Sequence, residues 1–213
     1  MRQNLDARPI LIAIAGPNGA GKTTLYQTQI SYTGLPFVNA DIIAAESSLG
    51  AYEAAEIAEA IRRERFARRE SFIFETVFSD PVGEKLAFME EAAEAGYTVV
   101  LFFVGIASPD VSVDRVGLRV LQGGHAVPEE KLVTRYPRVM ENLRLAMLRL
   151  PLVLVYDNDD LREPHRFCLA AGMGKVLETS GAMPEWLHGL LPGATWSGEE
   201  IAGSLRVPGP VAP

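Results

Sequence analysis

The residues with the clearest chemistry lie near the amino end, where glycine, lysine and threonine recur at a fixed spacing. Residues 16–23 read GPNGAGKT, which matches the nucleotide phosphate-binding pattern G-x-x-x-x-G-K-[ST]. Glycines allow consecutive backbone N–H groups to turn toward phosphate oxygens, and a helix that begins there favours negative charge. We expect Lys22 to reach the β- and γ-phosphates of ATP and the Thr23 hydroxyl to ligate Mg²⁺. The residues predicted to surround the phosphates are Gly16, Pro17, Asn18, Gly19, Ala20, Gly21, Lys22, Thr23 and Thr24.

Polar residues that follow the expected strands are candidates for the rest of the site, because ligands of parallel sheets lie beyond the carboxyl ends of the strands. Asp41 is predicted to accept the proton of an acceptor hydroxyl, although it could instead cap the next helical turn. We expect Glu75 to bind Mg²⁺ through water, to clamp substrate hydroxyls or to serve as a cap. Glu75, Thr76 and Ser79 are all predicted to contact the substrate, and Asp157 is a further candidate.

Arginines gather around a glycine-rich break and predict a lid over about residues 109–140. Arg115 and Arg119 are four residues apart and share a helix face, and Arg135 and Arg138 lie beyond the break. Cations in such a lid can stabilise charge on a transferring phosphoryl group. The spacing leaves open which of the four touches phosphate. Arg115 and His125, which follows the two glycines of the break, are expected to contact the substrate.

Apolar runs alternate with helical patterns along the chain. Strands are expected at residues 9–15, 37–40, 71–74, 97–104 and 152–156, with a hairpin at 166–176. Helices are expected at 51–69, at 80–95 with Asp80-Pro81 as its cap signature, at 108–122, and from 128 onward, where Pro137 should kink or split the helix. This order predicts an α/β P-loop fold with a mostly parallel sheet and helices on both faces. Residues 1–191 form one domain in this interpretation, and 192–213 form a Gly/Pro-rich tail.

Composition narrows the classes of function. The chain has 213 residues and a formal net charge of −7, which argues against a nucleic-acid partner held by phosphate neutralisation. Cys168 is the single cysteine, so no intrachain disulfide can form, and with three histidines the chain is a poor candidate for zinc. No apolar stretch reaches the length of a membrane span. We therefore expect a cytoplasmic protein with neither a nucleic-acid nor a membrane partner.

Four segments together resemble the short zeta-toxin-like P-loop kinases, over about residues 9–158. They are GPNGAGKTT at 16–24, NAD at 39–41, FET at 74–76, and RVGLRVLQGGHAVP at 115–128 followed by RYPRVMENL at 135–143. The resemblance implies a kinase that uses ATP and Mg²⁺ to phosphorylate a sugar hydroxyl of UDP-N-acetylglucosamine or a related small molecule. It further implies that Asp41 is the base, that Lys22, Arg119 and Arg135 act on the phosphates, and that an antitoxin protein restrains the enzyme.

Two other functions stay open. An ABC-type ATPase is suggested by LQGG at 121–124 and by VLVYD at 153–157, although Asn158 stands where that class places its catalytic glutamate. A different small-molecule kinase on the same fold, acting on a nucleoside or an antibiotic hydroxyl, shares every motif quoted above.

Overall fold

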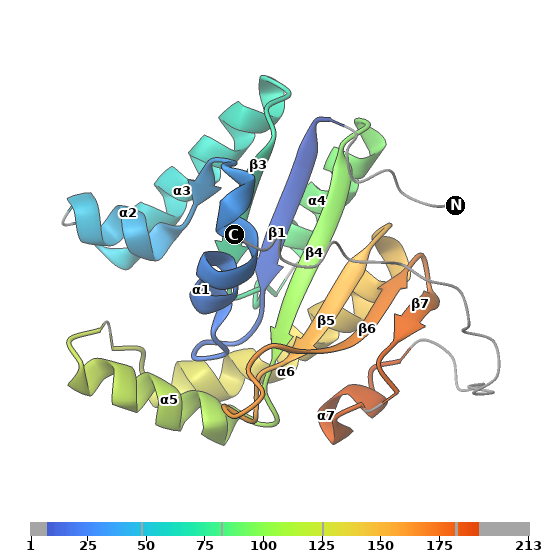
Figure 1. Ribbon diagram of the computed structural model, residues 1–213. Helices are drawn as coiled ribbons and strands as arrows, with labels where there is room; N and C mark the ends of the chain where they lie inside the picture. The colour runs from blue at the N-terminus through green and yellow to red at the C-terminus, as the bar shows by residue number, and fades with distance from the viewer. Residues whose placement is uncertain (1–7, 48, 82, 125, 182, 192–213) are drawn as a thin grey trace.

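The computed structural model describes residues 8–47, 49–81, 83–124, 126–181 and 183–191, and the expected tail at 192–213 lies outside them. Its centre is a seven-stranded sheet in the order β2-β3-β1-β4-β5-β6-β7 (Figure 1). The strands are β1 (Ile10–Ala15), β2 (Phe37–Val38), β3 (Phe72–Thr76), β4 (Thr98–Gly105), β5 (Val153–Asp157), β6 (Arg166–Gly172) and β7 (Lys175–Thr179). The first five strands are parallel, and β6 and β7 continue the sheet as an antiparallel hairpin. The predicted fold class is confirmed.

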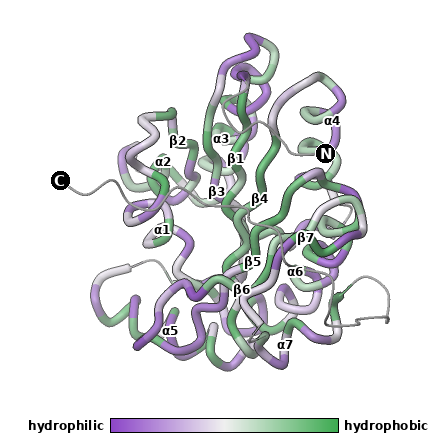
Figure 2. Tube along the Cα trace, turned by 45° about the vertical axis from the view of Figure 1, so that its right-hand side comes forward, coloured by the Kyte–Doolittle hydropathy of each residue, from purple (hydrophilic) through white to green (hydrophobic). Residues whose placement is uncertain are grey.

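Helices cover the sheet on two sides. They are α1 (Lys22–Leu25), which continues into the π-helical turn Tyr26–Ile30 and the 3-10 turn Ser31–Thr33, α2 (Ala40–Ser47), α3 (Ala51–Ala67), α4 (Glu84–Glu94), α5 (Pro109–Leu121), α6 (Glu129–Arg149) and α7 (Glu185–His188). Residues of α3, α4 and α6 pack in the main core against one face of the sheet, and α1 packs on the opposite face (Figure 1). The central strands are therefore buried on both faces, which explains their unbroken apolar sequences. Figure 2 shows hydrophobic residues along β1 and β4 and a mixture of hydrophobic and hydrophilic residues along α5.

One expected helix start is wrong, and one of the two alternatives for Pro137 is excluded. The helix predicted from residue 80 begins at Glu84, because Gly83 adopts φ 71° as its N-cap residue and Asp80 lies in the preceding loop. The Asp80 carboxylate accepts a hydrogen bond from the backbone N–H of Lys85 at 3.3 Å, so it reaches the helix from outside. Pro137 does not split α6, which runs unbroken from residue 129 to 149. Buried residues on both sides of the proline, among them Leu132 and Leu143, hold the two halves against the core.

The helices of the described residues are too short or too polar to cross a bilayer. The longest, α6, has 21 residues and carries charged side chains along its length.

A steric prediction concerns the end of β4, where Gly105 meets the indole of Trp186. A Cβ atom at Gly105 would lie 2.2 Å from two atoms of that ring. We expect Gly105→Ala to lower the free energy of unfolding by about 1–3 kcal/mol, because overpacking forces the ring or the strand to shift. Urea denaturation measures the change. Gly117→Ala on α5 is the control, since no atom lies within 4 Å of its added methyl group and a helical alanine is favoured by about 0.5–1 kcal/mol. Equal stability of Gly105→Ala and the unsubstituted protein would contradict the prediction.

Candidate active site

The predicted phosphate-binding segment, residues 16–24, comprises the loop 16–21 that connects β1 to α1 and the first residues of α1. Two of its glycines adopt a positive φ and also leave no room for a side chain. A Cβ atom at Gly16 would lie 2.1 Å from the Val104 carbonyl oxygen, and one at Gly21 would lie 2.5 Å from the Asn158 side-chain nitrogen. These positions therefore require glycine for the loop to keep its path between β4 and the loop that follows β5.

The first residues of α1 meet the end of β3. The Thr23 hydroxyl donates a hydrogen bond to the Glu75 carboxylate at 2.9 Å, and the Lys22 ammonium lies 3.9 Å from the same carboxylate. Lys22 is buried and also donates to the Pro17 carbonyl oxygen at 2.9 Å. Burial lowers the pKa of Lys22, the charges of Glu75 and Asp41 oppose that shift, and the charge of Arg119 adds to it. Lys22, the predicted phosphate ligand, and Thr23, the predicted metal ligand, thus both contact Glu75.

Asn39, and not Asp41, caps α2. Its side-chain oxygen accepts hydrogen bonds from the backbone N–H groups of Asp41 at 2.7 Å and Ile42 at 3.3 Å, so Asn39 caps α2. The capping alternative for Asp41 is wrong. The Asn39 amide also donates to the Glu75 carboxylate at 2.9 Å. Asn39 therefore connects the base candidate to the cluster at the phosphate-binding loop. The sequence signal for this role is the asparagine of the NAD segment at 39–41, which stands directly before a helix.

A cavity of about 490 Å³ opens beside this cluster, and we call it the central cavity. It is lined by most of the residues predicted to act on substrate, namely Lys22, Asp41, Glu75, Thr76, Ser79 and Arg135. At its mouth the Tyr52 hydroxyl and the Lys131 ammonium lie 3.1 Å apart, which joins α3 to α6. The structure thus places Asp41, Lys22 and Arg135 in the lining of the central cavity.

The remaining lid residues lie in different places. Arg115 donates to the backbone carbonyls of Asn158 at 2.8 Å and Asp159 at 2.9 Å, so it holds the loop after β5 and does not line the central cavity. Arg119 is close enough to Lys22 for its charge to lower the lysine pKa. Arg138 lines a second hollow between α4 and α6. His125 lies outside the described residues.

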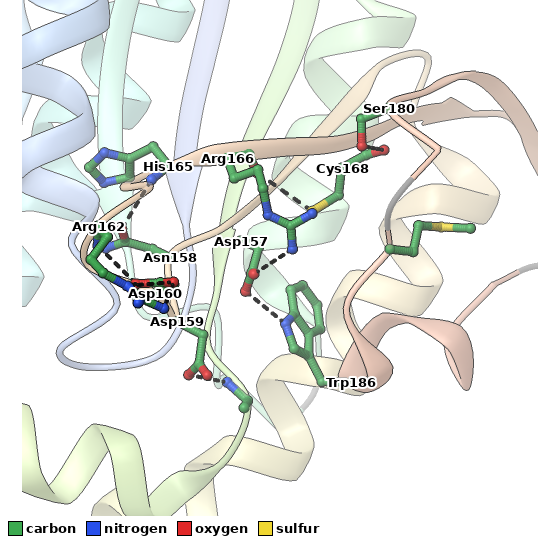
Figure 3. Close-up of polar contacts among 12 residues, drawn as sticks. Asp157, Asn158, Asp159, Asp160, Arg162, His165, Arg166, Cys168, Ser180 and Trp186 are labelled. Atoms are coloured by element: carbon green, nitrogen blue, oxygen red, sulfur yellow. Dashed lines mark hydrogen bonds and ion pairs between the residues drawn. The ribbon is translucent and has the colours of Figure 1, made fainter.

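A group of residues behind the phosphate-binding loop went unnoticed in the sequence. The Asn158 amide donates to the Ala20 carbonyl at 2.7 Å, and its side-chain oxygen accepts from the His165 backbone N–H at 3.0 Å. The His165 ring nitrogen lies 3.0 Å from the Gly21 carbonyl oxygen. Figure 3 shows Asn158 and His165 next to each other in the segment between β5 and β6. This segment therefore contacts two carbonyls of the loop and helps to fix its path.

Asp157, the last of the strand-end candidates, has structural partners. Its carboxylate accepts from Arg166 at 2.8 Å and from the indole N–H of Trp186 at 3.0 Å (Figure 3). The side chain is 8 % exposed and does not line the central cavity. Asp157 therefore ties α7 to the hairpin and has no place in the candidate chemistry.

The residues present fit a nucleotide with Mg²⁺. Among the described residues, no group of three or more His, Cys, Asp and Glu side chains could enclose a metal ion. Mg²⁺ in kinases is usually held by one or two protein oxygens together with substrate phosphates and water, so it needs no such enclosure. The paired oxygens of Thr23 and Glu75 at the mouth of the phosphate-binding loop match that requirement.

The fold and the phosphate-binding loop define a P-loop protein. A sequence model of the zeta toxin family matches residues 36–166, and the chain belongs to that family. No curated protein matches the sequence.

Several solved structures share the fold. A putative kinase from Chloroflexus aurantiacus J-10-fl superposes with a TM-score of 0.53 at 23 % identity, over 74 % of this chain and 92 % of that one. The PezAT toxin-antitoxin system of Streptococcus pneumoniae gives a TM-score of 0.54 at 16 % identity, over 76 % and 72 %. The AvrRxo1-ORF1:AvrRxo1-ORF2 complex with sulphate ions gives 0.60 at 16 % identity over 83 % of this chain, which spans only 62 % of that one. A further structure of this complex contains ATP.

Burial of His165 generates a prediction about pH. Burial lowers the pKa of this imidazole from its ordinary 6.5, and the contact with the Gly21 carbonyl opposes the shift only partly. The unfolded chain therefore binds a proton at a higher pH than the folded chain, and stability decreases as the pH falls below about 6.5. We expect His165→Gln to reduce the loss of unfolding free energy between pH 7.5 and pH 5. Urea denaturation at both values measures it. His188→Gln, which removes an exposed histidine, is the control, and an equal loss in all three proteins would contradict the prediction.

Proposed function

We propose that this protein transfers the γ-phosphoryl group of ATP to a hydroxyl group of a small molecule. The observation that carries the proposal is that Asp41 lines the same cavity as Lys22 and Glu75. The cavity of about 490 Å³ has the size of a small-molecule site, so it offers room for an acceptor beside these residues.

The binding residues have separate roles in this proposal. Bound ATP with Mg²⁺ supplies the phosphoryl group and neutralises part of its charge. The backbone N–H groups of residues 16–24 orient the phosphates, and Lys22 approaches the β- and γ-oxygens. Thr23 and Glu75 provide the protein oxygens near the metal, directly or through water. Arg119 and Arg135 oppose the charge of the transferring group from the lid side.

Asp41 is the proposed base. Its carboxylate lines the central cavity, and it accepts the proton of the acceptor hydroxyl as the oxygen bonds to phosphorus. Thr76 and Ser79, which line the same cavity at the end of β3, provide hydroxyls that can orient the acceptor. Arg115 and His125 remain substrate contacts predicted from the lid pattern, and Arg115 would need to leave its carbonyl partners to serve as one.

The family suggests finer details that we carry as proposals. The resemblance predicts a UDP-sugar as the acceptor, which an acceptor panel can test. Two of the structural neighbours are a toxin-antitoxin system and a two-protein AvrRxo1 complex, and they support an antitoxin as partner. Family membership favours this kinase over the ABC-type ATPase. The LQGG segment that suggested the ATPase lies at the carboxyl end of α5, where a helix presents carbonyls and not amides to an anion.

Replacing the lysine tests nucleotide binding. We expect Lys22→Ala to abolish phosphoryl transfer and to weaken ATP binding strongly, because it removes the buried cation nearest the phosphates. Calorimetric titration with ATP and Mg²⁺ measures the binding. Lys175→Ala on the exposed face of β7 should bind like the unsubstituted protein. Unchanged heat and affinity in Lys22→Ala would place the nucleotide elsewhere.

Replacing the base tests the chemistry. We expect Asp41→Asn to retain ATP binding and to lose about 10²–10⁴-fold in kcat, which is the usual contribution of a general base. The rate of label transfer from γ-labelled ATP to acceptor measures it. Glu46→Gln on the same helix, an exposed acid that does not line the cavity, should keep the full rate. Full activity of Asp41→Asn would show that another group accepts the proton.

A further inference from the structure

Asn158 is the first residue after β5, and each of its polar atoms has a hydrogen-bond partner. Its backbone N–H donates to the Gly105 carbonyl at 2.9 Å, and its backbone carbonyl accepts from Arg115 at 2.8 Å. Its side-chain amide donates to the Ala20 carbonyl at 2.7 Å and accepts from the His165 backbone N–H at 3.0 Å. Asn158 is 5 % exposed, so these bonds fix its place between the end of β4, α5 and the phosphate-binding loop.

His165 contacts the next carbonyl of the loop. Its ring Nε2 lies 3.0 Å from the Gly21 carbonyl oxygen, and the residue is 8 % exposed. A carbonyl oxygen can only accept a hydrogen bond, so this nitrogen carries a hydrogen and donates it in the neutral and in the protonated ring. His165 also has a φ of 55°, which is uncommon for a residue other than glycine. The surrounding bonds therefore hold the ring against the start of α1.

These two contacts act on groups that are predicted to bind phosphate. The carbonyls of Ala20 and Gly21 share their peptide units with the backbone N–H groups of Gly21 and Lys22. A peptide unit is planar, so a bond that fixes its carbonyl also fixes the direction of its N–H. Asn158 and His165 lie outside the phosphate-binding segment and do not line the central cavity. Any effect that they have on a nucleotide therefore passes through the loop.

We propose that Asn158 and His165 are positioning residues of the nucleotide site and set its affinity for ATP through the loop carbonyls that they hold. This inference rests on the proposed function and adds residues that the phosphate-binding motif does not contain. Where only a fraction of the molecules holds the binding conformation, the apparent Kd rises by the inverse of that fraction. A loop that keeps its path in about a tenth of the molecules binds ATP about tenfold more weakly.

Two substitutions of His165 separate its hydrogen bond from its packing. His165→Leu removes the N–H donor, whereas His165→Gln keeps an N–H group near the position of Nε2. We expect the Kd for ATP with Mg²⁺ to rise about tenfold in His165→Leu and to stay within about twofold in His165→Gln. Calorimetric titration of the full chain measures both. Equal weakening in the two variants would show that packing alone is responsible, and it would overturn the role of the bond to Gly21.

A substitution of Asn158 tests the other contact. Asn158→Leu removes both side-chain hydrogen bonds without adding a charge, and we expect the Kd for ATP to rise about tenfold or more. Urea denaturation of the same sample measures the free energy of unfolding. A role in stability alone would lower that free energy and leave the ATP affinity of the folded protein unchanged, which would overturn the proposal. Glu163→Gln, at an exposed position of the same segment, should bind ATP like the unsubstituted protein.

The titrations also distinguish this inference from the proposed function. Unchanged ATP affinity in both leucine variants overturns the positioning role and leaves the proposed kinase intact. Weaker ATP binding in these variants, in a protein that transfers label to no acceptor, supports the positioning role and counts against the kinase. Absence of ATP binding by the unsubstituted protein overturns both.

Discussion

The site depends on the position of one carboxylate, that of Glu75 at the end of β3. It accepts hydrogen bonds from Thr23 and Asn39 and lies near Lys22, so it joins the phosphate-binding loop to the start of α2. The register of the sheet fixes this meeting point, because β1 and β3 are adjacent parallel strands with Ile14 opposite Glu75. Asp41 follows Asn39 by two residues and inherits its place from the same contacts. A shift of β3 by one residue would turn Glu75 to the other face and separate base from lysine.

The phosphate-binding loop is held from behind by bonds to its carbonyls. Asn158 contacts Ala20, His165 contacts Gly21, and Ser112 donates to the Asn18 carbonyl at 2.6 Å. Each of these partners comes from an element far along the chain. These bonds fix the path of the loop before an anion arrives. They explain why α5 and the β5–β6 segment contribute to the candidate nucleotide site although neither contains the phosphate-binding motif.

The sequence alone was sufficient to predict features that depend on a local property of one residue or one segment. The phosphate-binding loop follows from glycine's access to positive φ, and the buried strands follow from their apolar runs, so both were predicted. The sequence was insufficient where two residues suit the same role and only their tertiary contacts decide between them. Asn39 and Asp41 both suit a helix cap, and only the position of Glu75 decides in favour of Asn39. Arg115 and Arg119 share a helix face, yet Arg115 donates a hydrogen bond to the loop after β5. Arg62 and Glu59 are three residues apart on α3, a spacing typical of solvent-exposed ion pairs. The structure adds that both residues line the central cavity.

Dipoles reconcile an acidic protein with a nucleotide. In the proposed function the phosphates are held largely by backbone N–H groups and a helix amino end, which do not alter the formal charge of −7. Side chains from the middle of α3 and the start of α4 line another part of the central cavity. Glu59 pairs there with Arg62, Arg63 and Lys85, so three cations share one carboxylate in a chain whose formal net charge is negative.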